Sequence, residues 1–200
     1  MKPRVSHQKT AALTLLEVVV VVLVMAVLVA ILLPLFARSK GGNYFSCARN
    51  LREIGMAYRI WAGDNGDKYP MDVSMTNGGT MELVAAGNVA ATFQVMSNEL
   101  STPKIILCPQ DVSRDYATNF TTDFNNSRIS YFVGADADEK NPQMFVSGDA
   151  NFEIGGVPVK SGLLGFYSNA PIAWSAARHK FSGNVALADG SVQAVNNSTS

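Results

Sequence analysis

A single carboxylate stands at the edge of a long apolar segment, and its position is the first sign of chemistry in this sequence. Glu17 is followed by Val18–Leu33, in which no side chain is polar, and the apolar character continues after Pro34. An ionisable side chain at the centre of a bilayer costs on the order of 3 kcal/mol. A carboxylate kept beside such a segment therefore indicates a function for Glu17.

Two ordinary explanations of the apolar segment leave part of the sequence unexplained. A secretory signal peptide has an apolar region of about 7–15 residues followed by a small-residue cleavage site. This run is longer, and the residues at 37–40, Ala-Arg-Ser-Lys, match that site poorly. A plain membrane anchor needs about 20 apolar residues, which accounts for the run but not for Glu17. Lys2, Arg4 and Lys9 precede the run and favour a cytoplasmic N-terminus.

The stretch Ala12-Leu13-Thr14-Leu15-Leu16-Glu17 resembles the processing site of type IV pilins and type II secretion pseudopilins. The resemblance implies that residues 1–12 are a leader, that a prepilin peptidase cuts between Ala12 and Leu13, and that the same enzyme methylates the new amine of Leu13. Glu17 is then the fifth residue of the mature chain, as in that family, and Pro34 matches a recurrent pilin proline. The family usually has Gly in place of Ala12 and Phe in place of Leu13.

The same resemblance implies a role in assembly. In a filament core that excludes water, Glu17 would pair with the N-terminal amine of Leu13 in a neighbouring subunit, because a lone buried charge is strongly unfavourable. The implied partners are the prepilin peptidase/methyltransferase, identical or related pilin subunits, an inner-membrane assembly platform and membrane lipid. The implied location is the bacterial inner membrane, crossed once with the N-terminus in the cytoplasm and the head outside it, and then the filament.

These features favour a structural subunit of a type IV pilus-like or type II secretion pseudopilus filament. The alternative from another class is a membrane-anchored binding module that uses the same leader but does not polymerise. A third class, an anchored hydrolase, would have to use His179 and Asp189.

A second set of candidate residues lies near the C-terminus. His179, nine residues and then Asp189-Gly190 resemble the H-x9-DG motif that names a subgroup of prepilin-type proteins. A catalytic triad of this type needs a nucleophile elbow, and the sequence contains no G-x-S-x-G motif. The other histidine, His7, falls in the proposed leader. We therefore expect no catalytic residue and no enzyme. Asp189 would form a turn, while His179 hydrogen-bonds to nearby backbone or to the Asp189 carboxylate.

Oxygen ligands supply one candidate metal site. Asp136, Asp138 and Asp149 have the hard donors that calcium prefers, and major pseudopilins that this chain resembles can bind calcium in a C-terminal loop. Their spacing does not fit the EF-hand pattern, so a solvated acidic loop is the favoured interpretation. No other cofactor is expected.

The two cysteines, Cys47 and Cys108, leave two interpretations open. A disulfide suits a segment expected outside the cytoplasm, and closing some sixty residues would stabilise by about 4 kcal/mol in the chain-entropy model. The alternative is a pair of buried thiols, because Cys47 lies on an apolar stripe and free cysteine is readily buried.

A long helix must position these residues. Apolar side chains recur at helical intervals of three and four residues, at Tyr44, Cys47, Leu51, Ile54, Tyr58 and Trp61. The sequence predicts one helix over Leu13–Ala62, about 75 Å long, loosened at Pro34 and Gly41-Gly42 and ended by turn residues 63–67. Residues 13–37 would form the membrane or filament-core part and residues 38–62 the amphipathic continuation.

Residues 63–200 are predicted to form an extracytoplasmic α+β head in which the long helix packs on a small antiparallel sheet, a pilin-like fold. The candidate strands are Ile129–Val133, Met144–Ser147, Leu164–Tyr167, Asn184–Ala188 and Ser191–Val195, and the candidate short helices are Met81–Ala86 and Phe93–Leu100. Asp189-Gly190 predicts a two-residue hairpin turn. Tyr131, Trp174 and Phe181 are expected in the core.

Composition excludes one function class. The formal net charge is zero, with sixteen basic and sixteen acidic residues, and no basic face is evident. A general nucleic-acid-binding role therefore has little support in the sequence.

Overall fold

The structure is a computed structural model that describes residues 15–36, 42–159, 161–165 and 170–197. It divides into two compact units, Met1–Lys40 and Gly41–Ser200, and each is described by itself. The second unit holds helices and two antiparallel sheets, so the chain has the predicted α+β class. The proposed leader and Leu13 lie outside the described residues.

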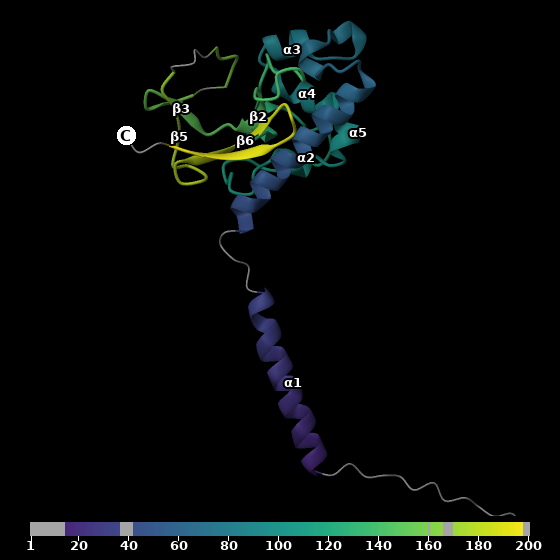
Figure 1. Ribbon diagram of the computed structural model, residues 1–200, viewed down its shortest axis with the longest axis vertical. Helices are drawn as coiled ribbons and strands as arrows, with labels where there is room; N and C mark the ends of the chain where they lie inside the picture. Colours follow the sequence, from purple (N-terminus) through teal and green to yellow (C-terminus); the bar gives the residue numbers. More distant parts are fainter. Residues whose placement is uncertain (1–14, 37–41, 160, 166–169, 198–200) are drawn as a thin grey trace, which may run out of the picture. The chain divides into compact units, whose positions relative to one another are not determined.

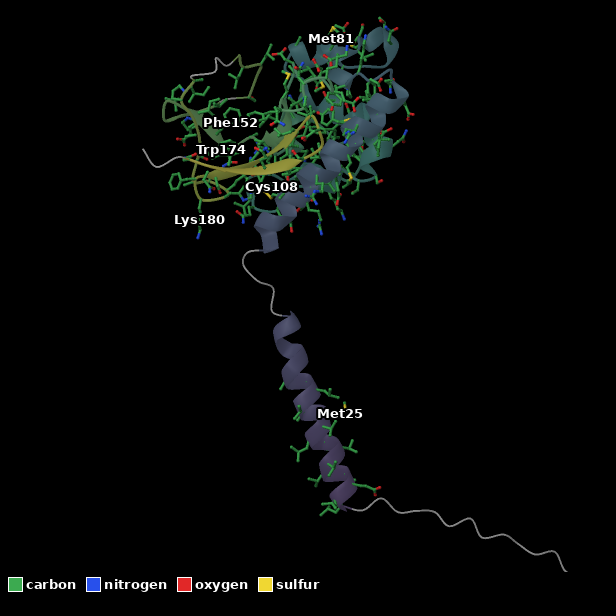
Figure 2. All side chains as sticks on the ribbon, viewed as in Figure 1. Met25, Met81, Cys108, Phe152, Trp174 and Lys180 are labelled. Atoms are coloured by element: carbon green, nitrogen blue, oxygen red, sulfur yellow. A yellow bond between two sulfur atoms is a disulfide. The ribbon has the colours of Figure 1, made fainter. Side chains whose placement is uncertain are left out.

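The first unit contains α1, Leu15–Phe36, with Glu17 in its first turn. Side chains from residue 15 to residue 30 are all exposed, and they project from every side of the helix (Figure 2). Apart from Glu17 and the small Ala26 and Ala30, these exposed side chains are leucine, valine and methionine. In the part of the chain that the structure describes, no helix combines the length and the apolar character needed to cross a bilayer.

The structure describes two helices where the sequence predicted one. α1 ends at Phe36 and α2 spans Gly42–Asp64, while residues 37–41 lie outside the described part. Pro34 lies within α1, and the predicted loosening at Gly41-Gly42 stays a prediction because Gly41 lies outside the described residues.

α2 ends at the predicted turn. The backbone N–H groups of Asn65 and Asp67 both donate to the carbonyl oxygen of Ala62, at 2.9 Å each. The Asn65 side chain also donates to the Trp61 carbonyl at 2.8 Å. Gly66 and Asp67 then take positive φ angles of 69° and 57°, which turns the chain away from the helix axis.

The larger sheet has the strand order β1-β2-β6-β7, with every neighbour antiparallel; Figure 1 labels its two central strands, β2 and β6. Its strands are β1 Tyr131–Val133, β2 Phe145–Asp149, β6 Ser182–Leu187 and β7 Val192–Asn196. Four of the five predicted strands fall here, which confirms them. The fifth, Leu164–Tyr167, is wrong: Leu164 and Gly165 are not in a strand, and residues 166 and 167 lie outside the described part.

A second, smaller sheet was not predicted. Its order is β4-β3-β5, built from β3 Phe152–Ile154, β4 Val157–Pro158 and β5 Ile172–Trp174. These strands have only two or three residues and no long apolar alternation, so they carry a weak sequence signal. Trp174 joins the two sheets, since it pairs with Phe152 (Figure 2) and its indole covers Gly183 of β6 so closely that a Cβ there would overlap the ring.

The β6–β7 hairpin differs from the predicted two-residue turn. The Gly190 N–H donates to the Leu187 carbonyl and the Leu187 N–H donates to the Ser191 carbonyl, each at 2.9 Å. The loop therefore has three residues, 188–190. Only Gly190 has a positive φ, 83°, which fits a type I turn followed by a left-handed glycine.

Short helices complete the head. The α-helices are α3 Met81–Ala85, α4 Val89–Val95 and α5 Ser97–Leu100, which confirm both predicted helical segments. The 3-10 helices are η1 Pro70–Asp72, η2 Met75–Asn77, η3 Pro103–Ile106 and η4 Asn126–Arg128.

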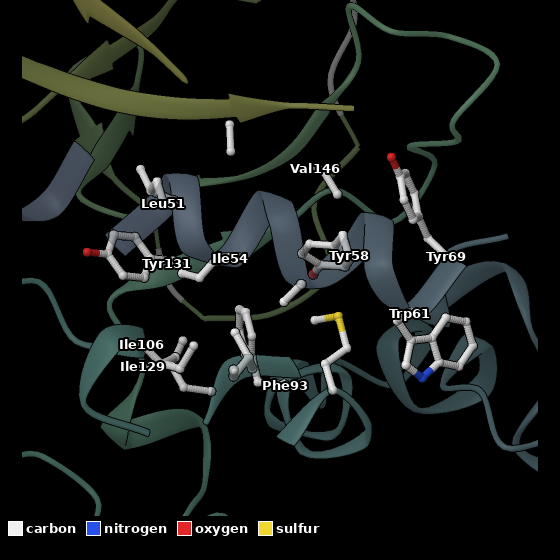
Figure 3. Packing of buried hydrophobic residues seen from close by; sticks show 14 of the residues in the cluster. Leu51, Ile54, Tyr58, Trp61, Tyr69, Phe93, Ile106, Ile129, Tyr131 and Val146 are labelled. Carbon is white, nitrogen blue, oxygen red and sulfur yellow. The ribbon is translucent and has the colours of Figure 1, made fainter. Parts of the chain in front are cut away.

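The core lies on both sides of α2. Figure 3 shows α2 between strands on one side and short helical segments on the other, in agreement with its contacts to β2, β6, α5 and η3. The predicted stripe from Cys47 to Trp61 is buried, whereas the side chain of Tyr44 lies outside the described part. Tyr131 and Trp174 are also buried as predicted. The core assignment of Phe181 is wrong, because its side chain is 58% exposed in a turn with φ 64°.

We predict that Ile54→Ala destabilises the head by about 3 kcal/mol, because Ile54 is fully buried and the truncation leaves a cavity. Ile60→Ala is the matched control, since Ile60 lies on the same helix with 56% of its surface exposed. Its effect should stay within about 0.5 kcal/mol. Urea unfolding of the detergent-solubilised chain, followed by tryptophan fluorescence, measures both; equal losses would contradict this packing.

Candidate functional site

Four buried side chains meet beside the N-terminal half of α2. Cys47 and Cys108 are joined in a disulfide with a Cα–Cα distance of 5.2 Å. The Nε2 atom of His179 lies 3.4 Å from Cys108 Sγ and 3.4 Å from Asp149 Oδ2. All four side chains are buried. The carboxylate of Asp149 also accepts hydrogen bonds from the backbone and side-chain nitrogens of Asn184, at 2.8 and 2.9 Å.

Each of these side chains comes from a different part of the head. Cys47 lies on α2, Cys108 follows η3, Asp149 ends β2, and His179 precedes β6. Figure 2 labels Cys108 beside α2. The disulfide closes a sequence separation of 61 residues and, in the chain-entropy model, stabilises by about 4 kcal/mol. Of the two interpretations of the cysteines, the structure has the disulfide.

The H-x9-DG residues fasten the two ends of β6 to α2. His179 lies against the disulfide of Cys47, whereas the turn at Asp189 reaches a later part of the helix. There the Arg59 guanidinium donates to the Asp189 carbonyl at 3.1 Å. A Cβ built on Gly55 would lie 3.7 Å from Gly190 Cα, so helix and turn approach closely. The nine residues between His179 and Asp189 thus contain strand β6, which packs across α2 and has contacts to the helix region near both of its ends.

Two partners were expected for His179, nearby backbone or the Asp189 carboxylate; the carboxylate that lies beside its Nε2 atom is that of Asp149. The Asp189 carboxylate instead accepts the Ser191 N–H at 2.8 Å. The hydrogen bonds from Ser191 hold the pKa of the Asp189 carboxyl below its usual value. Asp189 therefore forms the turn, as the sequence analysis expected, while the histidine is paired through β2.

A second buried polar cluster surrounds Asp111. Its Oδ2 atom lies 2.6 Å from Arg178 Nη2 and 2.7 Å from Arg114 Nη1, and it accepts a 2.8 Å hydrogen bond from Ser130 Oγ. Ser113 Oγ donates to the other oxygen at 2.6 Å. Burial acts to raise the pKa of the Asp111 carboxyl, but the hydrogen bonds from Ser113 and Ser130 and the charge of Arg178 hold it below its usual value.

Sequence reasoning missed this second cluster, although a local signal was present. Asp111 follows Cys108-Pro109 by two residues, and its N–H donates to the Cys108 carbonyl at 2.8 Å. Arg178 immediately precedes His179. The two clusters therefore use neighbouring residues of the same two chain segments, Cys108 and Asp111 on one and Arg178 and His179 on the other. Contacts in one cluster therefore help to position the side chains of the other.

The calcium candidates do not form one site. Asp149 is buried beside His179, whereas the Asp138 carboxylate is used by its own loop and accepts hydrogen bonds from Lys140 and Asn141. Across the described residues, the one group of three side chains close enough to share a metal ion is Cys47, Cys108 and His179. Asp136, Asp138 and Asp149 are thus not brought together around a common point.

An open groove of about 580 Å³ lies beside the Asp111 cluster. Its lining includes Gln110, Asp111, Phe152, Glu153, Ser175 and Arg178. The groove thus presents hydrogen-bonding and apolar side chains from the loop after Cys108 and from the smaller sheet.

The predicted assembly residues fall in the first unit. Glu17 lies in the first turn of α1, and Pro34 lies near the end of the same helix. Ala12 and Leu13, the predicted cleavage and methylation residues, lie outside the described residues.

Comparison of the chain with protein-family models, with curated proteins and with solved structures found no match.

The Asp111 cluster predicts a specific dependence of stability on pH. Because the folded-state pKa of Asp111 is depressed, its contribution is complete above the unfolded pKa of about 3.9 and is lost as the pH falls through the lower folded value. The wild type should therefore lose more unfolding free energy between about pH 5 and pH 2 than Asp111→Asn does.

Urea unfolding over this pH range measures the difference. Asp115→Asn, at an exposed aspartate of the same loop, is the control and should follow the wild-type curve. Parallel curves for wild type and Asp111→Asn would contradict the prediction.

Proposed function

We propose that this protein is a structural subunit of a type IV pilus-like or type II secretion pseudopilus filament, processed by a prepilin peptidase and assembled through α1. One observation carries the proposal: the described side chains of α1 are exposed and apolar on all sides, with one carboxylate, Glu17, in the first turn. A helix that is apolar all round is stable only when other apolar groups surround it. Lipid tails and the helices of other subunits are two such surroundings.

The order of these two surroundings follows from the sequence. Lys2, Arg4 and Lys9 before the apolar run Val18–Leu33 favour a membrane stage with the N-terminus in the cytoplasm. Cleavage after Ala12 would then create an amine at Leu13, four residues before Glu17. In the filament this amine would pair with Glu17 of a neighbouring subunit, since a buried carboxylate needs a positive partner. The pairing would also set the axial register between subunits.

The fold of the head supports the proposal in a second way. α2 is joined to the loop after η3 by the Cys47–Cys108 disulfide at one end and to the β6–β7 hairpin turn through Arg59 at the other. A subunit of a filament carries mechanical load between its assembly helix and its head. Two fastenings along α2 suit that requirement, because slipping of the helix would have to break both.

A second candidate function is a membrane-anchored binding module that does not polymerise. The groove beside Asp111 and Arg178 favours it, because a concave surface with convergent polar groups is a common form of ligand site. The two functions differ in what surrounds α1, so they make different predictions for crosslinking. Cysteines introduced into α1 should give a ladder of crosslinked subunits in a filament and no ladder in an isolated anchor.

Mass spectrometry of the mature N-terminus tests the processing step. We expect a chain that begins with N-methyl-leucine at Leu13, because Ala12-Leu13 is the proposed junction. Cells that lack the prepilin peptidase are the control and should retain residues 1–12. An intact Met1 in membranes of cells with the peptidase would contradict the proposal.

Substitution of Glu17 tests the assembly step. Glu17→Ala should reduce incorporation into sheared filaments at least about tenfold, since the loss of a buried charge pair costs several kcal/mol. Glu53→Ala is the matched control, because this residue is part of a solvent-exposed i,i+4 pair with Arg49 on α2 and should assemble normally. Immunoblots of sheared and membrane fractions measure the distribution. Equal incorporation of Glu17→Ala and wild type would refute the role of Glu17.

A further inference from the structure

We propose that Cys47, Cys108 and His179 form a zinc site when their disulfide is reduced. This zinc site is a separate proposal and does not depend on the proposed filament function. The oxidised chain would hold a disulfide and the reduced chain a metal ion, so the same three side chains would fasten α2 in either redox state.

The separations of the ligand atoms suit this exchange. The two Sγ atoms and one imidazole nitrogen all lie within 4.8 Å of one another. Cys108 Sγ and His179 Nε2 are 3.4 Å apart. Two ligands of a tetrahedral zinc ion, with Zn–S of about 2.3 Å and Zn–N of about 2.0 Å, stand about 3.5 Å apart. After reduction the two Sγ atoms must separate to about 3.8 Å, the distance between two thiolates on one zinc ion.

The charge and softness of the donors also select zinc. Thiolate and imidazole together are preferred by zinc over magnesium or calcium. Two thiolates cancel the charge of the ion, and a neutral imidazole leaves the complex neutral, which suits a buried position. Three protein ligands leave the fourth tetrahedral position to water.

The Asp149 carboxylate lies beside the three proposed zinc ligands. Its Oδ2 atom lies 3.4 Å from His179 Nε2, and within the described chain its buried Oδ1 atom accepts no hydrogen bond. A carboxylate beside the ligand set can accept a hydrogen bond from a metal-bound water. Outer partners of this kind commonly change metal affinity by about 10- to 100-fold.

The exchange balances with a dithiol as the reductant. The dithiol attacks the Cys47–Cys108 bond and becomes a disulfide itself, while two electrons and two protons pass to the protein to give two thiols. Binding of Zn²⁺ to both sulfur atoms then releases those two protons. In the reverse exchange a small-molecule disulfide accepts two electrons from the two thiolates and, with two protons from solvent, becomes a dithiol; the Cys47–Cys108 bond forms again and the ion is released.

Cobalt titration of the full-length chain tests the site. The chain is kept in detergent, reduced with a phosphine and held without oxygen, and Co²⁺ is added as the spectroscopic probe. We expect one equivalent to produce thiolate-to-cobalt charge-transfer absorption and the intense visible bands of a tetrahedral site. Zn²⁺ should displace the cobalt and release two protons per ion relative to the reduced, metal-free chain at a pH where the thiols are protonated. The oxidised chain should give no such bands.

Single substitutions identify the ligands. Cys47→Ser, Cys108→Ser and His179→Gln should each weaken Co²⁺ binding at least about 100-fold, and Asp149→Asn about tenfold. His7→Gln is the matched control, because His7 is the other histidine of the chain, and it should bind as the wild type does.

Thermal unfolding followed by circular dichroism shows whether the folded chain or the unfolded chain binds the metal. Zinc should raise the melting temperature of the reduced wild type and leave that of the oxidised wild type unchanged. The proposal is overturned if the reduced wild type gives no charge-transfer band, if Cys108→Ser or His179→Gln keeps full affinity, or if the reduced chain is unfolded and zinc does not refold it.

Discussion

The burial of α2 on two sides is the constraint on which the rest of the head depends. A surface helix needs one apolar stripe, but this helix carries side chains that pack on strands β2 and β6 and on short helices α5 and η3. Leu51, Ile54 and Tyr58 are fully buried as a result. The sheet and the short helices therefore share one core around α2 (Figure 3). The disulfide and the hairpin turn fix the helix within this core.

The sequence predicted those parts of the fold that local periodicity and turn chemistry decide. The stripe on α2 has the spacing of a helix, and residues 63–67 contain the glycines and Asn65 that end it. The strands of the larger sheet contain short runs of β-forming residues, such as Tyr131–Val133, and the last two strands flank the Asp189-Gly190 turn. The smaller sheet was missed because Val157–Pro158 and its neighbours are too short for a period to appear. Phe181 was assigned to the core by its type alone, yet its left-handed backbone places it in an exposed turn.

The candidate site was only partly predictable, because some of its side chains come from segments that are far apart in the sequence. His179 and Asp189 belong to one motif, and the Asp189 carboxylate was one of the two partners expected for His179. In the fold β6 separates them, and Asp149 reaches His179 from the adjacent strand β2, 30 residues earlier in the chain. Strand order decides such a pairing, and a single sequence does not contain the strand order. The Cys47–Cys108 pair was easier, because two cysteines allow only one intramolecular disulfide.

One rule connects the head with the proposed filament: a carboxylate removed from water needs a positive partner or hydrogen-bond donors. In the head the fold provides both, as Arg178 and Arg114 contact Asp111 and Asn184 donates to Asp149. Arg114 is three residues from Asp111, but Arg178 and Asn184 come from distant segments, so these contacts form only when those segments are brought together in the fold. The proposed assembly applies the same rule between chains, with the amine of one Leu13 meeting the Glu17 of another. In this proposal the positive charge would arise only after removal of residues 1–12, because an uncleaved chain would have a peptide bond at Leu13 in place of an amine. Processing would then control assembly by creating the partner that makes burial of Glu17 in a filament core favourable.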